Sequence, residues 1–202
     1  MTVTLNHRGC RLQRAAWRRL LTALTGVMLA LSAVLQSGCS PTYNWREYRD
    51  PDGSYRVLMP GRVSELSREI NLDGIVLPMS MSGALVDSTR FAVGVVRLKE
   101  AGQRDHVLAA MRTAMLRNIA APTHHDRPCE VPVIDASGQA LARVAAQCVS
   151  AQGRANNSPQ SMEAMFVARG DHVWQVVVIG ERIDALQAQT LFEAFRVVGE
   201  SR

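Results

Sequence analysis

From residue 45 onward the chain repeatedly alternates apolar and polar residues, and this pattern predicts β-strands joined as hairpins. Turn sequences such as "RDPDG" at residues 49–53 and "NLDG" at residues 71–74 separate the alternating segments. The segment "VWQVVVI" at residues 173–179 is almost continuously apolar, which is typical of a strand inside a sheet. The predicted strands are Trp45–Tyr48, Tyr55–Met59, Arg62–Ile70, Ile75–Val86, Phe91–Leu98, Cys129–Ile134, Ala140–Val149, Met162–Val167 and His172–Ile179.

Two further segments place apolar residues at helical spacing. The first is predicted to begin at a capping residue, Asp105, to run to about Ala120 and to be stopped by Pro122. The second is predicted from about Ile183 to Val197. The expected apolar stripes are Leu108, Met111, Met115 and Ile119 on the first helix, and Ala185, Ala188, Leu191, Phe192, Phe195 and Val198 on the second. Strands, helix, strands and helix in this order predict an α+β fold, an antiparallel β-sheet built from hairpins and covered by two amphipathic helices.

The start and the end of this region carry short motifs of a known family. The start reads "W…DGSYRVLMPG", with Trp45, Asp52-Gly53, Tyr55-x-Val57 and Pro60-Gly61, and the end reads "LFEAFRVV", with Phe195 near the last helix end. These motifs resemble the PsbP-like family. The resemblance implies an α/β/α sandwich and a role in binding or assembly rather than catalysis, and it supplies no catalytic motif to carry over.

The N-terminal residues have the layout of a secretory signal peptide. Five arginines and no acidic residue precede an uncharged stretch from Leu20 to Leu35. As a helix this stretch would be about 24 Å long, shorter than the ~30 Å hydrocarbon core of a membrane. Next, Ser37-Gly38-Cys39 resembles the lipobox of bacterial lipoproteins, whose cysteine is lipidated, although Gln36 stands where an apolar residue is usual. The alternatives are an ordinary cleaved signal with a soluble product, and an uncleaved anchor helix.

The lipobox interpretation divides the chain into three parts. Residues 1–38 are predicted to be a removed signal, residues 39–44 a short tether, and residues 45–202 a single domain. Lipid on Cys39 would attach the protein to the cell envelope, and Ser40 behind it resembles the sorting pattern for the outer membrane, facing the periplasm.

Removing the signal also removes the apparent basic character of the chain. The whole sequence has 23 Lys and Arg against 18 Asp and Glu, and five of the arginines precede Cys39, which leaves 18 of each sign. Nucleic-acid binding requires an excess of basic side chains to neutralise phosphates, so the sequence predicts no nucleic-acid partner.

Cys129 and Cys148 remain once Cys10 is lost with the signal and Cys39 is assigned to lipid. An even pair in an exported protein predicts a disulfide, with two reduced thiols as the alternative. A hairpin centred between Gly138 and Gln139 would place the two cysteines directly opposite each other, whereas a tighter turn on Ser137-Gly138 would place them on a diagonal.

The remaining clusters of polar residues predict little chemistry. His124 and His125 precede Cys129, with His106 and His172 elsewhere, and a solvated loop is expected there rather than a metal site. The "RGD" at Arg169–Asp171 is expected to be a hairpin turn, and Ser150–Gln160 a polar loop. The sequence has no G-x-S-x-G, phosphate loop or H-E-x-x-H motif.

Taken together, these patterns predict a lipid-anchored, non-catalytic envelope protein without cofactor or metal, which binds an envelope partner or supports assembly. The alternative is a periplasmic small-molecule- or metal-binding protein, or an enzyme, with a pocket between sheet and helix. In the metal-binding version His106, His124 and His125 would converge.

Overall fold

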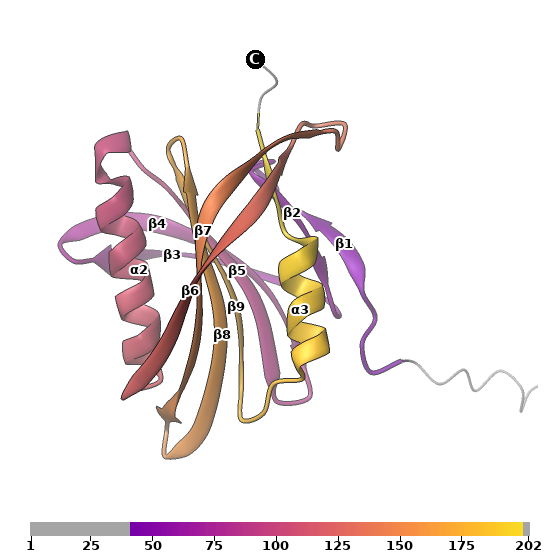
Figure 1. Cartoon of the computed structure of the whole chain (residues 1–202), viewed down its shortest axis with the longest axis vertical. Helices are drawn as coiled ribbons and strands as arrows, with labels where there is room; N and C mark the ends of the chain where they lie inside the picture. Colours follow the sequence, from indigo (N-terminus) through magenta and orange to yellow (C-terminus); the bar gives the residue numbers. More distant parts are fainter. Residues whose placement is uncertain (1–40, 200–202) are drawn as a thin grey trace, which may run out of the picture. The chain divides into compact units, whose positions relative to one another are not determined.

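The computed structural model describes residues 41–199, and these residues are organised by one sheet of ten strands (Figure 1). The strands are β1 (Arg46–Arg49), β2 (Tyr55–Met59), β3 (Ser64–Leu72), β4 (Ile75–Val86), β5 (Thr89–Arg97), β6 (Thr123–Ile134), β7 (Ala140–Ala155), β8 (Ser158–Arg169), β9 (His172–Gly180) and β10 (Arg196–Val198). The helices are η1 (Ala101–Gln103), α2 (Arg104–Asn118) and α3 (Ala185–Ala194). The spatial order is β1-β2-β10-β6-β7-β8-β9-β5-β4-β3.

The two ends of this sheet meet. β1 and β3 are the first and last strands of the spatial order, yet the Tyr48 hydroxyl of β1 donates a hydrogen bond of 2.8 Å to the Glu65 carboxylate of β3. Behind this pair, the hydroxyls of Tyr55 on β2 and Ser82 on β4 share a hydrogen bond of 2.5 Å. The sheet therefore curls until its outer strands are within side-chain reach, and we call this line of contact the seam.

The predicted sandwich, an antiparallel sheet covered by two helices, is wrong. Strands account for 57% of the structure and helical residues for 18%, and the curled sheet forms a β-rich half-barrel instead of a flat layer. The sheet is also mixed, because β10 runs parallel to β6 while the other neighbouring strands pair antiparallel. Strand twist accumulates over ten neighbours, so a sheet of this width curls instead of remaining flat between helices.

Part of the extra strand content lies where a loop was predicted. Ser150–Gln160 forms the ends of β7 and β8 around a tight turn at Asn156 and Asn157. Both asparagines have positive φ, 47° and 68°, which is the backbone that a two-residue hairpin turn requires and that asparagine tolerates.

The last predicted helix is too long at its C-terminal end. α3 stops at Ala194, and residues 196–198 form β10, which lies between β2 and β6. Val197 is completely buried there. The Val197 side chain is buried because residues 196–198 are extended. The free energy of this burial outweighs the local preference for a helix that the spacing of apolar residues indicates.

The start of the first helix also differs from the prediction. α2 continues directly from η1, its N-cap is Gln103 without a side-chain hydrogen bond, and Asp105 lies inside the first turn. Its buried side chains are Val107 and Met111, and Ile119 is buried just after its end. In α3, by contrast, the carboxylate of Asp184 accepts hydrogen bonds from the amides of Leu186 and Gln187.

Two hydrophobic cores lie on opposite faces of the sheet, one under each helix. The core beneath α3 includes Tyr55, Phe91, Trp174, Leu191 and Phe195. The core beneath α2 includes Met79, Met111, Ile119, Phe166 and Val177. Successive residues of β9 enter different cores, because side chains alternate along a strand. This explains the continuous apolar run at residues 173–179 and confirms its interior position.

A disulfide joins Cys129 of β6 to Cys148 of β7, the two cysteines that the sequence predicted to pair. They lie on a diagonal, because Cys129 is opposite Ala146 while Cys148 is opposite Arg127. The expected directly opposed register is therefore wrong. The turn runs over residues 135–139 and the register shifts at Val133/Ile134, and the Cα atoms are nevertheless only 5.9 Å apart.

Cys39, the predicted signal peptide and the first two residues of the predicted tether lie outside the described residues. Within residues 41–199, no helix has the length and apolar character needed to cross a membrane.

Candidate functional site

A polar pocket opens at the seam. It has a volume of about 360 Å³ and is lined by residues of β1 to β4 and of the turn between β1 and β2, among them Tyr48, Asp50, Tyr55, Glu65 and Ser82. We call it the seam pocket. Its lining includes three carboxylates, two phenols and three aliphatic hydroxyls, so it can both accept and donate hydrogen bonds.

The alternation of β4 places the hydroxyls of this pocket. In "MSMSGA", Met79 and Met81 pack toward the core beneath α2, while Ser82 faces the other side and reaches Tyr55. Serine is small enough to leave room for the two tyrosines. Because Ser82 is buried, its hydroxyl needs a partner, and Tyr55 supplies one.

Both phenols remain protonated well above neutral pH. Burial raises the pKa of Tyr55 above its ordinary value of 10.0, and the hydrogen bond with Ser82 only partly opposes this shift. Burial also raises the pKa of Tyr48, and the hydrogen bond to Glu65 raises it further. The phenols therefore act as neutral hydrogen-bonding groups beside the carboxylates of Asp50 and Glu65.

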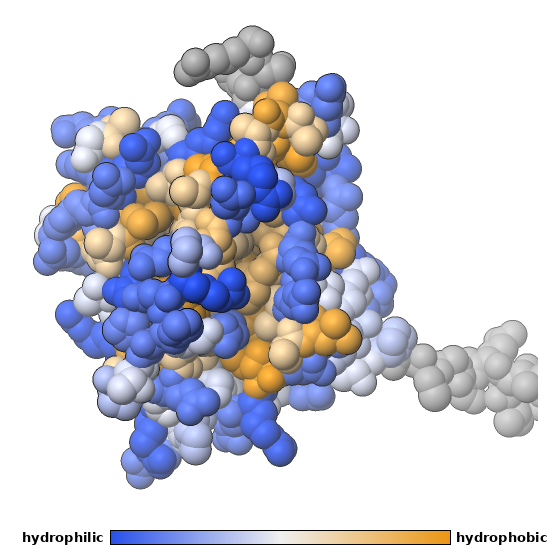
Figure 2. Space-filling model, in the orientation of Figure 1, coloured by the Kyte–Doolittle hydropathy of each residue, from blue (hydrophilic) through white to orange (hydrophobic). Residues whose placement is uncertain are grey.

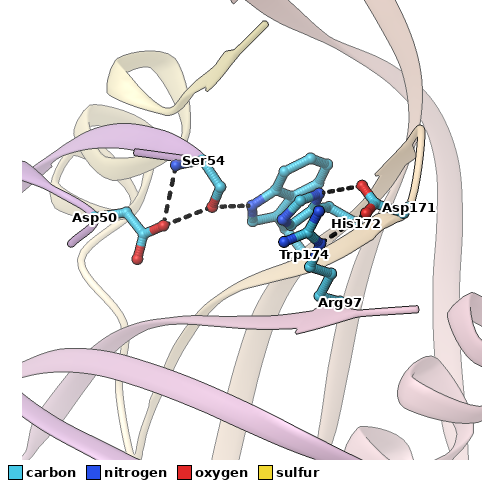
Figure 3. A network of polar contacts seen from close by, with 6 residues as sticks. All are labelled: Asp50, Ser54, Arg97, Asp171, His172 and Trp174. Atoms are coloured by element: carbon cyan, nitrogen blue, oxygen red, sulfur yellow. Dashed lines mark hydrogen bonds and ion pairs between the residues drawn. The ribbon is translucent and has the colours of Figure 1, made fainter. Parts of the chain in front are cut away.

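A buried chain of polar contacts begins at Asp50 (Figure 3). The Asp50 carboxylate accepts hydrogen bonds from the Ser54 amide at 3.0 Å and from the Ser54 hydroxyl at 2.7 Å. The indole Nε1 of Trp174 donates to the same hydroxyl at 3.2 Å. Asp50, Ser54 and Trp174 are all buried, so these bonds fix the wall of the seam pocket to the first half of β9.

The chain of contacts continues from Trp174 to the surface. The imidazole of His172 stacks on the Trp174 ring with centroids 5.4 Å apart, and its Nδ1 lies 2.7 Å from the Asp171 carboxylate. Arg97 Nε donates to the other oxygen of Asp171 at 2.7 Å, and this bond lowers the pKa of the Asp171 carboxyl. Figure 3 shows Trp174 standing between Ser54 and His172.

This arrangement is not a catalytic triad. In a triad an imidazole accepts the proton of the serine hydroxyl. Here the Ser54 hydroxyl donates to Asp50 and accepts from the Trp174 indole, while His172 stacks on the far side of that indole. The contacts position the pocket wall and do not activate a nucleophile.

A second, more open groove continues along β1. Its volume is about 820 Å³, and its lining includes Thr42, Arg46, Arg62, Leu85 and Asp87. We call it the N-terminal groove. Tyr48 lines both hollows, so they are neighbours along the seam. No residue of α2 or α3 lines either one, so they differ from the pocket between sheet and helix that the alternative hypothesis requires.

The histidines singled out from the sequence do not converge. His124 and His125 lie in β6, so the expectation of a loop there is wrong. His124 Nε2 lies 2.8 Å from Arg112 Nη2 of α2, and the same nitrogen of Arg112 donates to Asp126. His106 lies at the start of α2, 3.5 Å from Asp73. Among residues 41–199, no group of three histidine, cysteine or acidic residues is placed to hold a metal ion.

The "RGD" segment forms the predicted hairpin turn between β8 and β9, with Gly170 at φ 60°. Asp171 of this turn pairs with Arg97 and His172, so its carboxylate is already used within the fold.

Sequence reasoning missed the residues that line the seam pocket. The only local signal was the pair of serines in "MSMSGA", because hydroxyls on one face of an interior strand indicate polar partners on that face. Tyr48, Asp50 and Glu65 carried no such signal, since they come together only when the sheet curls.

No protein-family model matches this chain, and no curated protein matches it. Among solved structures, the chain is similar to PA94, a protein of unknown function from Pseudomonas aeruginosa. The two are 14% identical, the match covers 72% of this chain and 89% of that one, and the TM-score is 0.33. A TM-score this low carries no argument about fold or function. The resemblance to the PsbP-like family therefore stays a prediction.

Proposed function

We propose that this protein is a lipid-anchored, non-catalytic binding or assembly module of the cell envelope, attached through Cys39 to the outer membrane and facing the periplasm. The disulfide between Cys129 and Cys148 carries the proposal. Such bonds form and persist in oxidising compartments outside the cytoplasm, which fits an exported protein. The lipobox-like residues Ser37-Gly38-Cys39 then account for its attachment.

The seam pocket supports a binding role. Asp50 and Glu65 supply carboxylates, while Tyr48, Tyr55 and Ser82 supply hydroxyls. This combination suits a ligand surface that presents hydrogen-bond donors, such as amines or polar side chains of a partner protein. Exposed Leu66 at the rim of the pocket adds an apolar contact. The motifs that resemble the PsbP-like family favour the same class of function.

Fractionation of cells that express variants tests the anchor. Cys39→Ala is expected to abolish incorporation of an alkyne-labelled fatty acid and to release the protein from the membrane fraction. Cys10→Ala is the matched control, because Cys10 lies in the predicted signal, and it should remain labelled and membrane-bound. A Cys39→Ala protein that still carries the label would overturn the proposal.

Site-specific photo-cross-linking in intact cells tests the binding role. A cross-linking amino acid at Leu66 should give a discrete adduct that Glu65→Gln weakens. The same amino acid at Val76, an exposed residue that lines neither hollow, is the control and should give no such adduct. Equal cross-linking at both positions, or none at either, would contradict binding at the seam.

A further inference from the structure

An aromatic and apolar rim surrounds the start of the described chain. Tyr43 stacks on Trp45 with ring centroids 6.3 Å apart, and both rings lie nearly perpendicular to the Phe91 ring, at 82° and 86°. The Trp45 indole donates to Gln187 of α3 at 3.1 Å. The segment at residues 43–45 is therefore held firmly against β5 and the first turn of α3.

Two exposed leucines lie near this segment, Leu85 of β4 on the sheet face opposite to Phe91 and Leu186 at the start of α3. Leu85 and Leu186 are 64% and 66% exposed, the largest values among the exposed large apolar side chains of residues 41–199. Leu85 lines the N-terminal groove together with Thr42, and Leu186 directly precedes Gln187. We call Tyr43, Trp45, Leu85 and Leu186 the anchor rim. Figure 2 shows apolar side chains gathered over the lower end of α3, which is its N-terminal end.

Covalent geometry limits how far this rim can lie from a lipid on Cys39. Thr42 is the third residue after Cys39, and a fully extended chain spans at most ~11 Å over three residue steps at ~3.6 Å each. The polar headgroup region on one side of a bilayer is roughly 5–8 Å deep. An acyl-anchored Cys39 therefore keeps Thr42, which directly precedes Tyr43 of the anchor rim, at the depth of the headgroups or directly above them.

The chemistry of the rim fits that position. Tyrosine and tryptophan are enriched at membrane interfaces, and exposed leucine side chains gain free energy on entering the acyl boundary. The charges of the neighbouring groove balance, with Arg46 and Arg62 against Glu47 and Asp87. Binding of the anchor rim to a lipid surface would therefore be favoured by apolar contact and not by attraction to anionic lipid.

We propose that the anchor rim rests on the lipid surface, with Leu85, Leu186 and the adjoining aromatic rings in the interface. The inference rests on the proposed lipidation of Cys39. A domain tied only by a tether could rotate freely above the membrane. A domain seated on the rim would instead present the seam pocket in a fixed orientation.

Tryptophan quenching in reconstituted vesicles tests the inference. The lipidated protein is placed in phosphatidylcholine vesicles that contain phospholipid brominated near the carbonyl end of its acyl chains. The described domain has Trp45 in the rim and Trp174 in the core, the latter only 2% exposed. Bromine should quench the emission of the wild type, and the quenched component should disappear in Trp45→Phe.

The leucines are tested as a pair against matched positions. Leu85→Ser with Leu186→Ser should reduce quenching of Trp45 roughly twofold, because the interface contact is lost. Val76→Ser with Leu141→Ser, at residues 54% and 39% exposed that do not belong to the rim, should leave quenching unchanged.

The possible results separate the two proposals. A lipidated protein whose Trp45 is not quenched would overturn the membrane-seated rim and leave lipidation intact; a protein partner would then be the remaining occupant. Equal loss of quenching in both double variants would also overturn it. Absence of lipid on Cys39 would overturn both proposals.

Discussion

The hydroxyl of Tyr48 and the carboxylate of Glu65 join the two outermost strands of a ten-stranded sheet, 2.8 Å apart. Only 17 residues separate them in the chain, although they belong to opposite ends of the sheet order. The contact brings the two edge strands of the half-barrel, β1 and β3, within side-chain reach of each other. It also forms one wall of the seam pocket.

Tyr48→Phe should loosen the seam without unfolding the domain. The pair is exposed, so we expect a loss of no more than about 1 kcal/mol in the free energy of unfolding. Hydrogen exchange of the β1 amides should accelerate, while exchange in β8 and β9 should not. Unchanged exchange in β1 would show that the hydrogen bond contributes nothing to closure. Tyr43→Phe is the control, because Tyr43 lies outside the pocket lining.

Ser82→Ala should destabilise the domain more than its size suggests. Tyr55 is only 2% exposed, and its hydroxyl would lose its partner, at a cost of about 1–3 kcal/mol. Ser80→Ala is the matched control on the same strand, since Ser80 is exposed, and it should be nearly neutral. In urea unfolding, the double variant Tyr55→Phe with Ser82→Ala should lose less than the two single variants combined. If the loss in the double variant equals the sum of the losses in the two single variants, the hydrogen bond between Tyr55 and Ser82 does not contribute to stability.

Stability should fall above pH 10. Tyr48 and Tyr55 have pKa values in the folded state that are raised above the ordinary 10.0. As pH rises past 10, the unfolded chain releases protons that the folded chain retains, so the free energy of unfolding decreases. Urea unfolding from neutral to alkaline pH should show this decrease, and Tyr55→Phe should reduce its slope. An identical slope in the variant would contradict the burial of the phenol.

Reduction of the disulfide should lower the free energy of unfolding by about 2–4 kcal/mol. The bond closes a loop with a sequence separation of 19 residues, and its removal leaves the unfolded chain with more conformations. Thermal unfolding with and without reductant measures the effect. The double variant Cys129→Ala with Cys148→Ala should unfold at a lower temperature and lose its response to reductant. Mass spectrometry that finds two free thiols in the protein isolated without reductant would refute the pairing.

Gly153→Ala should disrupt the contact between β7 and the end of α2. A Cβ atom at this position would lie 2.0 Å from the carbonyl oxygen of Ile119, and the next amide, of Arg154, donates to that same oxygen. The backbone at Ile119 cannot easily move away from the added Cβ atom, so we expect the free energy of unfolding to fall by about 1–3 kcal/mol. Gly102→Ala is the control, because a Cβ there meets no atom within 4 Å. Comparable Tm values for both variants would contradict the close approach.

Much of the strand pattern could be predicted because it is local. The bounds of Tyr55–Met59 and Ile75–Val86 match the structure, since alternation and turn residues report directly on hairpins. The curl could not be predicted, because it sums small twists over ten strands. β10 could not be predicted either, because the apolar residues of "FRVV" fit the spacing of a helix as well as that of a strand. The pairing of Val197 with Val133, which is distant in the chain, decides between them. The seam pocket could not be predicted because it exists only once the sheet has curled.

β10 has a consequence for how the domain is made. The β1–β2 hairpin joins the rest of the sheet only through this strand of three residues, which lies between β2 and β6. During synthesis the β1–β2 hairpin is made before the rest of the sheet, yet its neighbour is supplied by residues 196–198, which are made almost last. The half-barrel, and the pocket at its seam, can therefore be completed only after nearly the entire chain has been made. Until then β2 has no second neighbour in the sheet, so a chain cut short before Arg196 should keep much of its β6–β9 core and still lack a formed pocket.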